Sequence, residues 1–314
     1  MEKTDAASSP GVSQRTLKNA IHCSGVGRHS GARVAMTLRP APPDLGIVFS
    51  RIDLNHRPWI SATWENASAD DLTTRLVNES GVEVAGIEPL MSALSGCAID
   101  NAMIELDGPE VPAMDGSAAP FVFLLECAGG AVQEAPRRAL EIRSPIRIGE
   151  DRGSLALSPG PGLTLDVACE ARAAAVGRQS WTVALDKQTY KREVSRARYF
   201  EFLESTDDVE AQDGRPDNAV TVVGDTIADD RPLRFANEFV RQEVQCMIGN
   251  LYLAGGPIVG LASARDATRD MTIRLLEKLF SETDAWSWNN VARRAAAETE
   301  EPAEALAKTA AVGG

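Results

Sequence analysis

The stretch Asn237-Glu-Phe-Val-Arg-Gln-Glu-Val-Gln-Cys-Met-Ile-Gly-Asn-Leu-Tyr-Leu253 predicts a long helix in the second half of the chain. A strand-like run over residues 258–262 follows it, and residues 270–281 again predict a helix. Upstream of the long helix, further strands are predicted over residues 139–142, 153–157, 163–169, 180–185 and 218–223, with a helix over residues 187–194. The second half therefore combines a sheet with several helices.

The first half shows the same order of elements. Strands are predicted over residues 33–38, 46–51 and 101–106, and helices over residues 88–94 and 118–125. We therefore expect an α+β fold with two domains of related plan. The expected divisions are a disordered tail (1–13), a first domain (14–127), a linker (128–138), a second domain (139–288) and a mostly disordered Ala/Glu-rich tail (289–314).

Composition excludes several classes of function. The 314 residues carry a formal net charge of −13 and contain no Lys/Arg-rich run, so nucleic acid is not an expected partner. The most apolar stretch, residues 251–264, is interrupted by glycines and a proline and is too short to insert into a membrane. Five widely spaced cysteines without a CxxC pair favour a reducing compartment, and we expect a cytoplasmic protein.

Several short segments, in a fixed order from residue 14 to about residue 286, carry a resemblance to one family. They are Gln14-Arg-Thr-Leu-Lys18, Gly25-Val-Gly-Arg-His-Ser-Gly31, Leu38-Arg-Pro-Ala-Pro42, Ile99-Asp-Asn-Ala102, Met114-Asp-Gly-Ser-Ala-Ala-Pro-Phe121, Ser195-Arg-Ala-Arg198, Asp217-Asn-Ala-Val220, Leu233-Arg-Phe235 and Asn237-Glu-Phe-Val-Arg241. This ordered set resembles the zinc-dependent UDP-3-O-acyl-N-acetylglucosamine deacetylases of bacterial lipid A synthesis. The resemblance implies two domains, each an antiparallel sheet with helices on one face, packed helix layer to helix layer around an interdomain active site.

The resemblance also implies a zinc ion held by two short motifs. One is a Glu-His pair at the start of a first-domain helix, where the Glu is the general base and the His a ligand. This chain has Glu88 and Pro89 at that place, and proline has no donor atom in its side chain. We expect Glu88 to be either a vestigial base or, more simply, a carboxylate that complements the helix dipole.

The second motif is His-Lys-x-x-Asp on a helix, with the His and Asp as the remaining ligands. Here Gln242 stands for the His, Glu243 for the Lys and Cys246 for the Asp, while the family's further catalytic His aligns with Thr268. A glutamate in place of the lysine is expected to repel an oxyanion and a substrate diphosphate. All three histidines of the chain lie within its first 56 residues. The sequence therefore predicts that the zinc site is lost and that no cofactor is bound.

A second departure concerns the acyl chain of the substrate. The resemblance implies an apolar, Gly-rich insert before the Asp-Asn-Ala segment, but residues 201–216 carry six carboxylates. Because unpaired carboxylates disfavour burial of a fatty chain, we expect the acyl passage to be absent.

These losses together predict a pseudoenzyme with no catalytic activity, which binds a protein partner as a scaffold or regulator, with envelope synthesis as the candidate process. The alternative is residual or altered hydrolase or binding activity on a UDP-N-acetylglucosamine derivative. A self-assembling scaffold is a third hypothesis, although the chain shows no coiled-coil heptads.

Overall fold

The computed structural model describes residues 12–70, 73–150, 153–171, 173–204, 218–228 and 231–291. Most of the two expected tails, and most of the acidic stretch 201–216, lie outside these residues. The helices are α1 (Glu88–Gly96), α2 (Ala119–Ala128), α3 (Lys187–Thr189), α5 (Glu238–Leu251) and α6 (Arg269–Ser281). A π-helical turn, Tyr190–Val194, continues α3.

The first half is built on a five-stranded sheet in the order β2 (Ile21–Val26), β3 (Arg33–Pro40), β9 (Ala102–Leu106), β4 (Ile47–Arg51) and β5 (Trp59–Ser61). Its central strand β9 alternates, so that Ala102, Ile104 and Leu106 are buried. The next three strands of the chain, which follow β5, form a separate three-stranded sheet: β6 (Ala67–Ala69), β7 (Thr74–Val77) and β8 (Glu83–Ala85).

The second half is built on a seven-stranded sheet around the long strand β19 (Ile258–Arg265), which pairs with three neighbours. Its other strands are β11 (Arg138–Ile142), β12 (Ile146–Glu150), β13 (Gly153–Ser158), β14 (Leu163–Glu170), β15 (Arg178–Ala184) and β20 (Trp286–Asn290). A separate three-stranded sheet contains β16 (Tyr199–Leu203), β17 (Ala219–Val223) and β18 (Thr226–Ile227).

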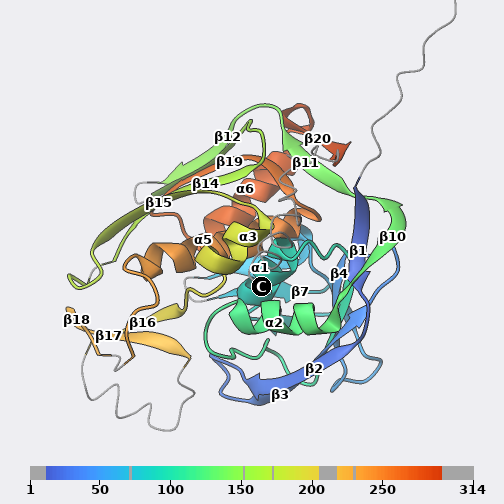
Figure 1. Ribbon diagram of the computed structural model, residues 1–314, viewed down its shortest axis with the longest axis horizontal. Coiled ribbons are helices and arrows are strands. Elements are labelled where there is room, and N and C mark those ends of the chain that lie inside the picture. The colour runs from blue at the N-terminus through green and yellow to red at the C-terminus, as the bar shows by residue number, and fades with distance from the viewer. Residues whose placement is uncertain are drawn as a thin grey trace, which may run out of the picture.

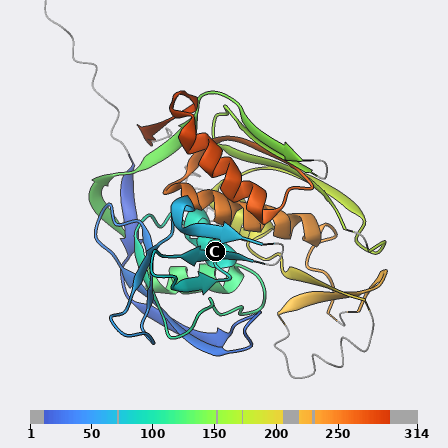
Figure 2. The ribbon, with the colours of Figure 1, turned by 180° about the vertical axis from the view of Figure 1, so that it is seen from behind.

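The two large sheets lie on the outside with the helices between them, as Figure 1 shows, and α6 is seen along its length from the opposite side in Figure 2. The predicted α+β class and the packing of helix layer on helix layer are confirmed. The sheets differ from the expectation because they are mixed: β4 runs parallel to β9, and β14 and β11 run parallel to β19. These parallel pairs are formed by strands that are far apart in sequence, so local patterns did not indicate their direction.

The segment 128–138, predicted as a linker, is a strand instead. β10 (Gly130–Pro136) pairs with β1 (Ser13–Leu17) in an antiparallel two-stranded sheet. Its Gln133 donates to the carbonyl oxygen of Ala41 and accepts from Asn101. The segment is therefore held to the first half by its backbone pairing with β1 and by the Gln133 side chain. The division of the chain into two domains at this place stays a prediction.

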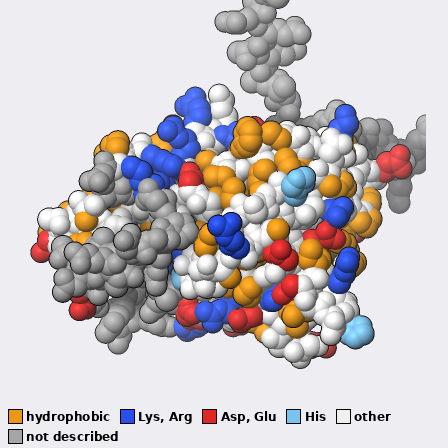
Figure 3. Space-filling model, turned by 90° about the horizontal axis from the view of Figure 1, so that it is seen from below, with side chains coloured by type: hydrophobic (Ala, Val, Ile, Leu, Met, Phe, Trp, Pro, Cys, Tyr) orange, Lys and Arg blue, Asp and Glu red, His pale blue; other side chains and the backbone are white. Residues whose placement is uncertain are grey.

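The surface in Figure 3 shows basic and acidic side chains interspersed with apolar ones, together with a group of basic side chains near the residues drawn in grey. Among the helices of the described segments, none is long and apolar enough to cross a membrane.

Candidate functional site

The candidate site lies where the first turns of α1 and α6 meet the middle of α5. Close approach of α1 and α5 depends on Gly249, because a Cβ there would lie 2.3 Å from the carbonyl oxygen of Glu88. This contact brings the start of α1, with Glu88 and Pro89, toward the α5 residues Gln242 and Cys246. The two segments that were matched to the zinc motifs are therefore close in space.

Glu88 is fully buried at the start of α1. Its Oε1 accepts a hydrogen bond of 2.8 Å from the backbone N–H of Thr74 and lies 3.2 Å from Nε of Arg269. Its Oε2 has no hydrogen-bond partner among the described residues, and neither has the buried hydroxyl of Thr74. Pro89 occupies the first turn of α1, where its missing N–H leaves no hydrogen bond unmade. Glu88 is thus held by a cation and a backbone amide.

Gln242 and Cys246 lie one turn apart on α5 and contact each other. Nε2 of Gln242 donates to Sγ of Cys246 at 2.9 Å, and both side chains are buried. Nη2 of Arg269 lies 3.8 Å from the same sulfur. Burial raises the pKa of the Cys246 thiol to about 12, so the sulfur is protonated at neutral pH.

Thr268 does not point into the site. Its side chain caps α6 by accepting a hydrogen bond of 3.3 Å from the N–H of Met271. The residue that reaches the site is the next one, Arg269, which sequence reasoning missed. The aligned segment 265–268 contained no histidine, and a shift of one position would have identified a charged residue there.

A cavity of about 610 Å³ opens beside these residues. Its walls come from the β2–β3 loop, β16, α5 and the start of α6, and they carry Arg28, His29, Tyr199, Phe200, Glu201, Phe202, Phe239, Gln242, Glu243 and Arg269. Desolvation raises the pKa of the Glu243 carboxyl, while the charge of Arg269 acts in the opposite direction. Glu243 and Arg269 line the same cavity, and the positive charge of Arg269 offsets part of the repulsion expected from the sequence position of Glu243.

The β2–β3 loop is held against this cavity by Glu110. The Glu110 carboxylate, itself buried, accepts hydrogen bonds from the backbone N–H groups of His29 and Ser30 and from the Ser30 hydroxyl. Arg28 lies over the Tyr199 ring, 4.4 Å from its centroid, and donates to the carbonyl oxygen of Phe200. His29 of this loop therefore lines the cavity together with the guanidinium of Arg28.

An aromatic cluster forms the apolar side of the cavity. The ring of Phe239 contacts those of Phe200 and Phe202 edge-on, with centroid distances of 5.3 and 5.8 Å. Phe202 is 45% exposed. The predicted loss of the acyl passage rested on residues 201–216, most of which lie outside the described residues. In the part that is described, apolar surface remains next to the site.

The side chains at this place do not match the zinc donors that the resemblance implies. Pro89 offers no donor, Gln242 offers a carboxamide, and Cys246 is a protonated thiol in contact with an amide and a guanidinium. Within the residues that the structure describes, no three His, Cys, Asp or Glu side chains converge as metal ligands. A guanidinium 3.2 Å from Glu88 also opposes a second cation by direct repulsion.

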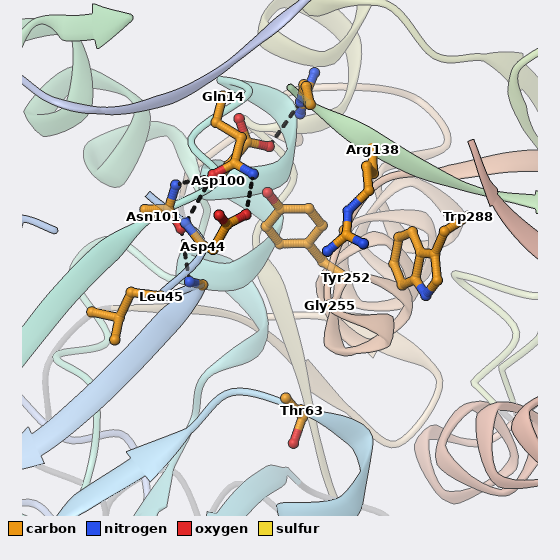
Figure 4. A pocket seen from close by; sticks show the side chains of 13 residues that line it. Gln14, Asp44, Leu45, Thr63, Asp100, Asn101, Arg138, Tyr252, Gly255 and Trp288 are labelled. Carbon is orange, nitrogen blue, oxygen red and sulfur yellow. Dashed lines mark hydrogen bonds and ion pairs between the residues drawn. The ribbon is translucent and has the colours of Figure 1, made fainter. Parts of the chain in front are cut away.

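A second pocket of about 230 Å³, shown in Figure 4, lies away from these helix starts. Its polar groups bond to one another: Gln14 donates to Asp44, Asn101 donates to Gln14, and Arg137 pairs with Asp100. Because these side chains already satisfy each other, the pocket is a structural junction, and the cavity at Arg269 is the better candidate site.

The protonated state of Cys246 gives a first testable prediction. In the native protein at pH 8, iodoacetamide should alkylate the exposed Cys127 and leave Cys246 unmodified, because a buried thiol with a pKa of about 12 supplies almost no thiolate. Mass spectrometry of peptides after timed labelling measures both sites. Labelling in urea is the control, since both thiols should then react. Equal rates in the native protein would contradict the prediction.

The fold is of the α+β class, and sequence comparison identifies the family. The family model for LpxC, UDP-3-O-acyl N-acetylglycosamine deacetylase, matches residues 14–281, so the chain belongs to this family. A UDP-3-O-acyl-N-acetylglucosamine deacetylase of Acidithiobacillus ferrooxidans is 40% identical over 291 residues, covering 91% of this chain and 95% of the relative. Deacetylases of the same name from Marinobacter nauticus and Vibrio parahaemolyticus are 41% and 37% identical, each covering 88% of the chain.

These relatives correct the expectation that the chain is not an enzyme. Proteins about 40% identical over nine tenths of the chain are named as deacetylases, which points to an enzyme. The physical reason for the error is that we equated loss of the zinc ligands with loss of the site. The structure instead has a cavity lined by Arg269, whose guanidinium lies 3.2 Å from the buried carboxylate of Glu88.

Proposed function

We propose that this protein binds a UDP-N-acetylglucosamine derivative in the Arg28–Arg269 cavity and hydrolyses its acetamide by altered chemistry. The observation that carries the proposal is the set of side chains that line this cavity. Two guanidinium groups, Arg28 and Arg269, suit the negative charges of a nucleotide diphosphate and of a developing oxyanion. The aromatic cluster of Phe200, Phe202 and Phe239 suits an apolar substituent on the sugar.

The proposed reaction is the addition of water to an acetamide. Water attacks the carbonyl carbon, and the C=O electron pair moves onto the oxygen beside a guanidinium. A carboxylate of the cavity, Glu243, accepts the proton of the water and passes it to the departing nitrogen as the C–N bond breaks. The products are acetate and an amine, and no electrons are gained or lost. Raising a carboxyl pKa by desolvation suits such a proton carrier.

Titration calorimetry tests the binding step. UDP-N-acetylglucosamine at millimolar concentration should bind saturably, and Arg28→Met should weaken the binding about tenfold or more because it removes one charge-assisted contact. Arg192→Met is the matched control, since the side chain of Arg192 is 68% exposed and does not line the cavity. Release of acetate from an acylated substrate measures the second step. Absence of binding at millimolar ligand would dispose of the proposal.

A protein partner and a cytoplasmic location remain predictions from the sequence. Affinity capture from the native cell, with variants in the 201–216 segment for comparison, is the measurement that tests the first.

A further inference from the structure

We propose that Arg269 is a catalytic residue that supplies the positive charge at the substrate carbonyl oxygen, so that the reaction needs no metal ion. This inference rests on the proposed function and assigns its chemistry to a side chain of the chain itself. The positive charge at the site is then the guanidinium of Arg269, which belongs to the polypeptide, and not a bound ion.

The position of Arg269 carries the inference. Its guanidinium joins the three elements that meet at the site: Nε lies 3.2 Å from Oε1 of Glu88 on α1, and Nη2 lies 3.8 Å from Sγ of Cys246 on α5. Its side chain is 16% exposed, and the residue forms part of the cavity wall beside Glu243 and Tyr199. It thus lies where the two motif segments converge and can still meet a ligand.

The surroundings keep this guanidinium charged. Desolvation acts to lower the pKa of Arg269, but the nearby carboxylates of Glu243 and Glu88 act in the opposite direction, and the pKa lies above its ordinary value. A guanidinium fixed by neighbours in a partly dry site stabilises a developing oxyanion without reorganisation, which is the largest contribution in many hydrolases. The Glu88 carboxylate beside this guanidinium has a second oxygen, Oε2, which is buried and has no hydrogen-bond partner among the described residues.

A purely structural role for Arg269 is the competing explanation, since Arg269 also compensates the buried charge of Glu88. The two roles differ in what a substitution changes. A structural ion pair affects stability, whereas a catalytic cation affects turnover and the binding of a carboxylate product. The experiment must therefore separate these readouts.

The variants Arg269→Gln and Arg269→Lys test the inference, with Arg274→Gln on the exposed face of α6 as matched control. Circular dichroism first establishes which variants fold. Arg269→Gln should reduce kcat for acetate release by about 10²–10³-fold, the usual effect of losing one oxyanion donor. Arg269→Lys, which keeps the charge, should lose less. The wild type should retain its turnover in a chelator, with substoichiometric zinc by elemental analysis.

Acetate binding gives a readout that does not depend on substrate. Saturation-transfer NMR should detect acetate on the wild type and on Arg274→Gln, and much less on Arg269→Gln. Acetate binding that is unchanged in Arg269→Gln, stoichiometric zinc in active protein, or turnover abolished by the chelator would each overturn the inference. If UDP-N-acetylglucosamine does not bind while acetate binding still requires Arg269, the proposed substrate is wrong and the assignment of the cation stands.

Discussion

Glu238→Ala is expected to lower the free energy of unfolding by about 3–5 kcal/mol, since removing one member of a buried ion pair leaves the other charge unpaired. Glu238 is fully buried at the start of α5 and binds Arg198, whose exposed fraction is only 1%. Its two carboxylate oxygens accept from Nε and Nη2 of Arg198 at 2.9 and 3.0 Å, and from the backbone N–H of Arg234. Losing Glu238 therefore affects the start of α5 and the chain before β16 together.

Urea unfolding followed by tryptophan fluorescence measures the effect. Glu282→Ala is the control: this carboxylate is about half exposed and lies 3.9 Å from Lys278, so its removal should cost less than about 1 kcal/mol. A loss for Glu238→Ala no greater than that of the control would show that the buried pair contributes little.

Gly249→Ala is expected to destabilise the protein by about 1–3 kcal/mol, the range for overpacking a close contact. Helix propensity alone predicts the opposite sign, because alanine in a helix interior is more stable than glycine by about 1 kcal/mol. The contact decides the sign: the added Cβ would lie 2.3 Å from the carbonyl oxygen of Glu88, and a backbone atom cannot rotate away. α1 must move relative to α5.

Gly162→Ala is the matched control, since a Cβ there meets nothing within 4 Å and should change stability by less than about 0.5 kcal/mol. Both variants are compared by thermal unfolding. Because movement of α1 displaces Glu88 from Arg269, Gly249→Ala should also weaken ligand binding, which calorimetry measures. A stability gain for Gly249→Ala would mean that α1 and α5 are packed less closely than described.

Local pattern was sufficient for several elements and for the helices that meet at the site. The alternation of residues 101–106 predicted β9, and the helix predicted over residues 237–253 is α5 with a short extension. The motifs alone placed Glu88, Gln242, Glu243 and Cys246 in candidate positions, and the fold brings these residues together. The expectation of inactivity failed because it considered only the missing zinc ligands. The order of residues along the chain does not indicate that the Arg269 side chain lies between Glu88 and Cys246.

The sequence by itself determined the α+β class, the family segments and the absence of histidine from both zinc motifs. Only the tertiary structure decided the parallel strand pairs, the strand formed by residues 130–136, and the presence of Arg269 rather than Thr268 in the site. Side-chain spacing follows from local helix and strand geometry, so sequence reports it directly. Contacts between α1, α5 and α6 depend on how distant segments pack, which local geometry does not determine. At the start of α6, the Thr268 hydroxyl caps the helix, whereas the guanidinium of the next residue, Arg269, reaches the cavity wall.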